Sequence, residues 1–264
     1  MERLSRPARK VPVNALGARV RSLTPGVALI VVAATCWAIT AQRMQGMDIG
    51  PGTPLGGLGW FAGVWVTMMA AMMLPSVVPM ALTYAGESRR TGARVSTAAT
   101  SVFTCGYLLT WAAAGVVAYG VIQGVRTLGV SWLDWDRGGP YVAGGVIVLA
   151  ALYELTPAKS MCLRHCCNPN LLTRRWRPGV PGALVMGLEH GGFCVGSSWA
   201  LMAVLFAVGV MNVTWMVVLA ALVAIEKLLP CNRAAIGAIA VFIAVLGIAV
   251  AFMPGHVPGM TIPG

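Results

Sequence analysis

Long apolar runs, separated by short polar or basic segments, dominate the chain. An α-helix needs about 20 apolar residues to cross a bilayer core of about 30 Å. Seven runs approach that length, although the first and fourth are short for a full crossing. The pattern predicts an all-α, polytopic membrane bundle of about seven transmembrane helices. The predicted spans are 25–41, 59–83, 96–122, 139–155, 183–207, 212–230 and 234–253.

The segments between these runs are too short to hold a separate soluble domain. We expect a basic cytoplasmic segment at 1–24, a single transmembrane domain at 25–253 and a short tail at 254–264. The first apolar run ends without a small-residue cleavage pattern, which favours a retained helix over a removed signal peptide.

Composition agrees with a membrane protein, since 58% of the residues are hydrophobic and 10% are charged. The net charge of +11 does not indicate nucleic-acid binding, because the basic residues lie at the ends of apolar runs. Of the 19 Lys and Arg residues, 16 fall on the side of the N-terminus. Basic residues accumulate on the cytoplasmic side of a membrane. The chain is therefore expected to have a cytoplasmic N-terminus and an outer C-terminus, with the lipid bilayer as its partner.

The fifth predicted span contains polar side chains that are costly at membrane depth and are therefore functional candidates. At about 100° per residue, His190, Cys194, Ser197 and Ser198 share one arc of the helix. Imidazole and thiolate groups bind transition metals. The His–Cys pair, one turn apart, is thus a candidate half-site for a metal.

Glycines flank this arc. Gly187 and Gly191 border it, whereas Gly192 and Gly196 lie opposite. Small residues let transmembrane helices approach closely. The polar arc is therefore expected to face other helices and not lipid.

Further soft ligands lie elsewhere in the chain. Met72 and Met73 precede Pro75 in the second span, where they are either adaptable packing or thioethers facing a soft metal. Cys162 and Cys166 follow the fourth span, which Pro157 is expected to end. Four-residue spacing can aim both sulfurs at one ion, although lipidated or idle cysteines have the same spacing.

Ionisable residues near the inner ends of two spans allow two interpretations. Lys227 is interpreted as a side chain that reaches back to the interface. Glu154 and Glu226 fall at similar depth and could form an acidic mouth. Glu189 could assist a metal at His190, although His190 could instead simply form a hydrogen bond across a helix interface.

Four ordered blocks carry a resemblance to a known family. They are WVTMMAAMMLPSVVPM, LTPAKSMCLRHCCNP, GLEHGGFCVGSSWALMAVLFAVGVMNVTWM and IEKLLP, spread over roughly 60–230. They resemble domain-of-unknown-function family 2182, bacterial proteins described as predicted metal-binding integral membrane proteins. The resemblance implies a multi-pass protein of the bacterial cytoplasmic (inner) membrane with a metal site, but no established reaction. It marks as motif positions Met72, Met73, Pro75, Lys159, Cys162, Cys166, His190, Cys194, Trp199, Met202, Met211, Asn212, Glu226 and Lys227.

One departure from the family pattern concerns the fifth span. Many members carry a Cys-Cys pair where this chain has Ser197 and Ser198. The substitution removes two soft ligands and leaves His190 and Cys194 on this helix.

We therefore predict a membrane protein that handles a transition metal, with copper favoured over zinc or iron. Its task would be transfer or insertion of the metal, or service to a membrane or periplasmic metalloprotein. Two alternatives stay open: a metallo-oxidoreductase acting on an apolar substrate or a quinone, and a cation- or proton-coupled transporter using Glu154, Glu189 and Glu226. Catalysis by a Cys194 nucleophile is disfavoured because no oxyanion donor or third triad member is identifiable. The predicted metal ligands are His190, Cys194, Glu189, Met72, Met73, Cys162 and Cys166.

Overall fold

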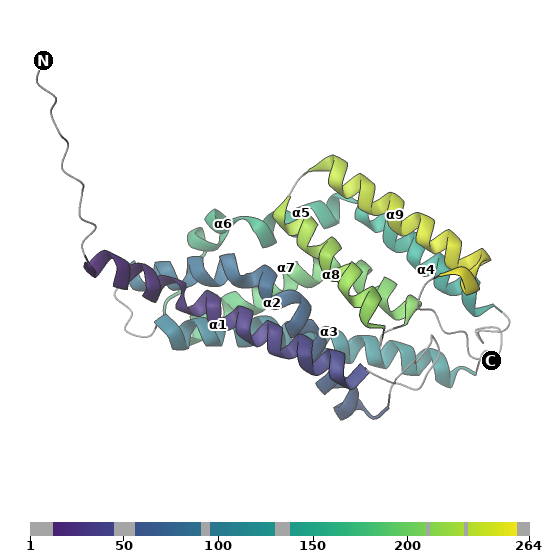
Figure 1. The fold of residues 1–264 in the computed structure, drawn as a ribbon, viewed down its shortest axis with the longest axis horizontal. Helices are drawn as coiled ribbons and strands as arrows, with labels where there is room; N and C mark the ends of the chain where they lie inside the picture. The colour runs from purple at the N-terminus through teal and green to yellow at the C-terminus, as the bar shows by residue number, and fades with distance from the viewer. Residues whose placement is uncertain are drawn as a thin grey trace, which may run out of the picture.

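The computed structural model describes residues 13–44, 56–90, 96–129, 138–209, 212–229 and 232–257. These residues are almost entirely helical, and no strand occurs among them (Figure 1). The helices are α1 (Val13–Met44), α2 (Leu58–Arg90), α3 (Ser96–Thr127), α4 (Gly139–Glu154), α5 (Pro157–Cys167), α6 (Pro169–Arg174), α7 (Gly179–Val208), α8 (Val213–Leu228) and α9 (Arg233–Phe252), followed by the 3₁₀ turn η2 (Pro254–His256).

Each of the seven predicted spans contains a helix, but fewer than seven are shown to be long enough to cross a membrane. By length and composition, α1, α2, α3, α7 and α9 could cross one, and the bent pair α4–α5 could form a sixth span. α8 has 16 residues, which is short of a full crossing. The all-α membrane architecture is thus supported with five or six spans, while the seventh and the orientation stay predictions.

The outer faces of the bundle are apolar. Val31 on α1, Val117 on α3 and Val245 on α9 are all exposed, together with many other large hydrophobic side chains. Soluble monomers seldom expose apolar surface on this scale. These faces are suited to lipid, in agreement with a multi-pass membrane protein.

The chain bends sharply after α4. As expected, the helix ends just before Pro157, which takes the first position of α5, while Thr156 caps that helix through the Lys159 backbone amide. The axes of α4 and α5 differ by 65°. The bend lays α5 against α7, and Cys166 of α5 is buried.

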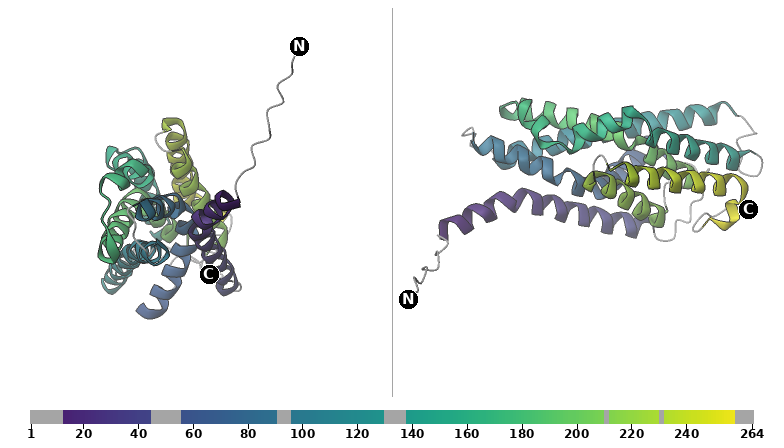
Figure 2. Two further views of the ribbon diagram at one scale, coloured as in Figure 1. Left: turned by 90° about the vertical axis from the view of Figure 1, so that its left-hand side faces the viewer. Right: turned by 90° about the horizontal axis from the view of Figure 1, so that it is seen from above.

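α7 is the central helix, since it contacts α3, α4, α5 and α8, and the long helices run roughly side by side along the molecule (Figure 2). Glycines allow the closest of these approaches. A methyl group on Gly187 would lie 2.1 Å from the Phe103 carbonyl oxygen of α3, and one on Gly191 would lie 2.7 Å from the Thr110 hydroxyl oxygen. The predicted glycine contacts beside the polar arc are therefore present.

Gly187→Ala tests this packing. Because the atoms in the way belong to the α3 backbone, the substitution forces the two helices apart and should lower stability by about 1–3 kcal/mol. Gly192→Ala is the matched control, because nothing lies within 4 Å of a methyl group there. The control should be neutral or slightly stabilising, as alanine favours helix. Thermal unfolding in detergent measures both variants, and equal unfolding temperatures would contradict the packing.

Candidate metal centre

The polar arc of α7 faces the interior, as its helical spacing predicts. His190, Cys194, Ser197 and Ser198 are all buried, with at most 5% of any residue exposed. Ser197 donates a hydrogen bond to the Cys194 carbonyl oxygen over 2.9 Å, and its hydroxyl lies 3.4 Å from that of Ser198. The serines are thus satisfied within the helix, and the soft donors on this face are His190 and Cys194.

Three helices supply polar groups around the Cys194 sulfur. The Lys227 ammonium of α8 donates to it over 3.0 Å, and the Tyr107 hydroxyl oxygen of α3 lies 3.1 Å from it. The thiol of Cys166 on α5 interacts with it as well. Cys194 is therefore the point at which α3, α5, α7 and α8 meet through their side chains.

Cys166 also faces His190, so that two thiols and one imidazole lie together. The Cys166 sulfur is 3.9 Å from His190 Nε2. The His190 ring packs against the Phe103 and Tyr107 rings of α3, each with its centroid 5.8 Å away. These aromatic neighbours hold the imidazole toward Cys166 in a water-poor interior.

The described part of the chain contains no group of three or more His, Cys, Asp or Glu side chains already placed to hold a metal ion. The spacing of Cys166 and His190 nevertheless suits a shared ion. Metal–sulfur and metal–nitrogen bonds of about 2.3 and 2.0–2.1 Å put two such donors roughly 3.5–4.4 Å apart. The observed 3.9 Å lies within that range. Cys166 and His190 are thus spaced as two ligands of one ion could be.

The predicted methionine ligands are buried, and their role as thioether ligands stays a prediction. Met72 and Met73 are buried in the same core cluster as Cys166 and Cys194. The α2 residue that hydrogen-bonds to this centre is Ser76, whose hydroxyl oxygen accepts from the Lys227 ammonium over 2.9 Å.

The other two predicted ligands have different surroundings. Cys162 packs against α7 one turn away from Cys166, with its sulfur 2.8 Å from a methyl placed on Gly196. Glu189 pairs with Arg177 over 3.5 Å, and both side chains are more than a third exposed. Glu189 also lines a small cavity that His190 lines. The roles of Cys162 and Glu189 as ligands stay predictions.

The prediction that the Lys227 side chain reaches back to the interface is wrong. Its side chain turns inward to Ser76 and Cys194 and does not reach back to the interface. A lysine at a helix end usually does so, because its long stem lets the charge reach water. The family resemblance marks the position, but only the structure reveals its partners.

Lys159 joins Glu154 and Glu226 in a buried ion triad, so the two carboxylates do not form an open acidic mouth. Its ammonium bonds Glu226 over 2.5 Å and also Glu154, and all three side chains are at most 1% exposed. Glu154 Oε1 is buried without a partner among the described residues. The triad ties α4, α5 and α8 together, and so fixes the helices that carry Cys166 and Lys227.

A family profile matches most of the chain. The PpoB2 family, described as a copper chaperone, matches residues 62–250, which include every residue of the centre described above. The match supports the expected link to copper, although the profile does not carry the family-2182 name. No curated protein and no solved structure matched.

Lys159→Met tests the triad. Removing the cation of the triad leaves two carboxylates buried together, and breaking a buried ion pair costs about 3–5 kcal/mol. The matched control is the triple variant that adds Glu154→Gln and Glu226→Gln, which removes every charge. The triple variant should recover much of the lost stability in detergent unfolding. A single variant as stable as the wild type would contradict the triad.

Proposed function

The chain belongs to the PpoB2 copper chaperone family, and from that premise we propose that it is a membrane protein that holds Cu(I) at Cys166, His190 and Cys194 for delivery to a metalloprotein. The bacterial inner membrane is the proposed location, and a membrane or periplasmic metalloprotein is the proposed recipient. Copper is the cargo in this scheme and not a resident cofactor.

The observation that carries the proposal is the meeting of two thiols and one imidazole from α5 and α7. Soft thiolate ligands select Cu(I) over hard cations, and imidazole binds copper as well. The thiols belong to buried residues, with 5% of Cys166 and 0% of Cys194 exposed. Such burial would protect a bound ion from water and from competing ligands.

Charge balance around the centre favours a monovalent ion. Cysteine binds metals as thiolate, so two thiolates and one Cu(I) sum to a net charge of −1. The Lys227 ammonium, 3.0 Å from Cys194, brings the total to zero. A divalent ion in the same place would leave a net charge of +1 in an apolar interior, where an uncompensated charge is costly.

Delivery requires that the ion can leave. Ligand exchange moves Cu(I) without a change of oxidation state, as thiolates of the recipient replace those of the chaperone one at a time. One thiol of the pair stands on α5, a helix of 11 residues, and the other on the long α7. Separate helices for the two thiols would let one sulfur withdraw while the other still holds the ion.

The transporter alternative is less well supported by the arrangement of the acidic residues. Glu154 and Glu226 share the Lys159 ammonium in the interior, whereas Glu189 pairs with Arg177 at an exposed position. The three carboxylates do not follow one another along a single path.

Removing a ligand should remove the copper. We expect about one Cu(I) per purified chain, with Cys166→Ser, Cys194→Ser and His190→Ala each lowering affinity at least tenfold, as loss of even supporting groups at metal sites costs about 10–100-fold. Cys105→Ser on α3 is the matched control, since that cysteine is exposed. Competition with a chromogenic Cu(I) chelator gives the affinities. Unchanged affinity in the Cys166/Cys194 double variant would refute the site.

Lys227 should set the preference between Cu(I) and Zn(II). Unit charges a few ångströms apart interact by about 4 kcal/mol at an effective dielectric constant of 20. Lys227→Gln should therefore shift the ratio of the two affinities toward Zn(II) by at least tenfold. Lys227→Arg keeps the charge and should keep the wild-type preference. Competition titrations measure the ratio, and equal behaviour of both variants would contradict the charge argument.

A further inference from the structure

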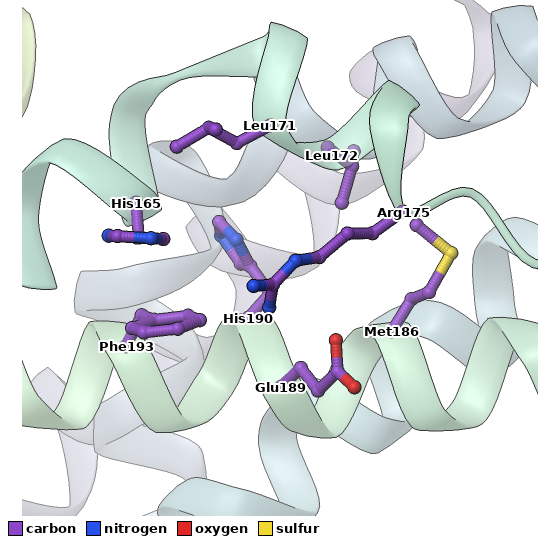
Figure 3. A pocket seen from close by; sticks show the side chains of 8 residues that line it. All are labelled: His165, Leu171, Leu172, Arg175, Met186, Glu189, His190 and Phe193. Carbon is purple, nitrogen blue, oxygen red and sulfur yellow. The ribbon is translucent and has the colours of Figure 1, made fainter.

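A small cavity lies between α7 and the segment that contains α5 and α6, next to the proposed copper site. Its volume is about 40 Å³, and its wall includes His165, Leu172, Arg175, His190 and Phe193 (Figure 3). A cavity of about 10–15 Å³ suffices for one water molecule. The space can therefore admit a metal ion together with a ligand atom.

The cavity is continuous with the buried thiols through one side chain. His190 lines it, and the Nε2 atom of the same ring lies 3.9 Å from the Cys166 sulfur. His190 is thus positioned to receive an ion from the cavity and to pass it to Cys166 and Cys194.

A second imidazole in the wall is oriented as a ligand. The His165 ring stacks on Phe193 with 4.6 Å between centroids, and its Nδ1 lies 2.9 Å from the Met161 carbonyl oxygen. A carbonyl oxygen only accepts, so Nδ1 carries the hydrogen and Nε2 keeps its lone pair. Metal-binding histidines characteristically donate their other N–H in this way. His165 is partly exposed, whereas His190 is buried.

We propose that this cavity is the port through which Cu(I) reaches Cys166 and Cys194, with His165 as the first acceptor and His190 as the second. The inference rests on the proposed copper site and adds a route to it. The nearly complete burial of both cysteine residues makes such a route necessary, and the two histidines provide donors at its exposed and buried ends.

The form of copper that suits the port is an anionic bis-thiolate complex of Cu(I). Arg175 and Glu189 both stand in the cavity wall, and Glu189 pairs with Arg177 over 3.5 Å. Arg174 precedes Arg175 in the sequence, so three arginines stand against one carboxylate and the local charge attracts an anion. In the exchange, His165 nitrogen replaces one donor sulfur on the ion and His190 receives the ion next. Bonds to Cys166 and Cys194 then form, while their two protons pass to the released donor thiolates. Copper stays Cu(I) throughout.

Rates of copper loading and release distinguish a residue that admits the ion from a residue that holds it after loading. Wild-type protein in detergent is mixed with a Cu(I)–glutathione complex and loading is followed by stopped flow, while chelator competition gives the dissociation constant. His165→Ala should slow loading at least tenfold and should slow release by the same factor, which leaves the dissociation constant within a few-fold of wild type. His256→Ala, on the exposed turn η2, is the matched control and should change neither quantity.

A second variant blocks the space and keeps the histidine. Leu172→Phe places a larger side chain in the cavity wall and should reproduce the slow loading with an unchanged dissociation constant. The port is refuted if both variants load at the wild-type rate, or if His165→Ala weakens binding as much as it slows loading. If the Cys166/Cys194 double variant also binds copper normally, the proposed function itself fails, whereas loss of copper in that variant confines the failure to the port.

Discussion

The arrangement of the bundle depends on two ammonium groups that lie inside it. A charge in an apolar interior must find partners, because the desolvation cost is otherwise several kcal/mol. Lys159 takes both nearby carboxylates, Glu154 and Glu226, and Lys227 takes the Ser76 hydroxyl and the Cys194 sulfur. Through these bonds the two lysines fix α2, α4, α5, α7 and α8 relative to one another. The triad holds α5 on one side, and α5 packs on α7 on the other. The position of α5 in turn brings Cys166 to Cys194.

Helical periodicity was sufficient to predict the local part of this structure. The seven apolar runs each contain a helix, and the arc of His190 and Cys194 on α7 is buried with glycine contacts beside it, because both features follow from 3.6 residues per turn. Which helices are neighbours does not follow from depth in a membrane. Pro157 marks the end of α4, but the direction of α5 depends on the 65° bend, so the contact of Cys166 with His190 could not be predicted. Met211, which the family resemblance marks as a motif position, lies outside the described residues.

The proposed centre combines protection with exchange, as a carrier of Cu(I) requires. Its donors are buried and its charge is balanced by Lys227, which favours tight and selective binding of a monovalent soft ion. Its two thiols stand on different helices, and His190 connects them to a cavity in which His165 keeps a lone pair available. Storage and release can thus use the same few side chains, with Cys166, His190 and Cys194 setting affinity and His165 setting the rate of exchange.

X-ray absorption spectroscopy of the wild-type chain, loaded with one equivalent of Cu(I), tests the central claim most directly. The Cys166–His190–Cys194 site predicts a Cu(I) edge and a first shell with two sulfur scatterers and one imidazole nitrogen. A first shell of oxygen and nitrogen alone, without sulfur, would contradict the account and place the copper elsewhere in the molecule.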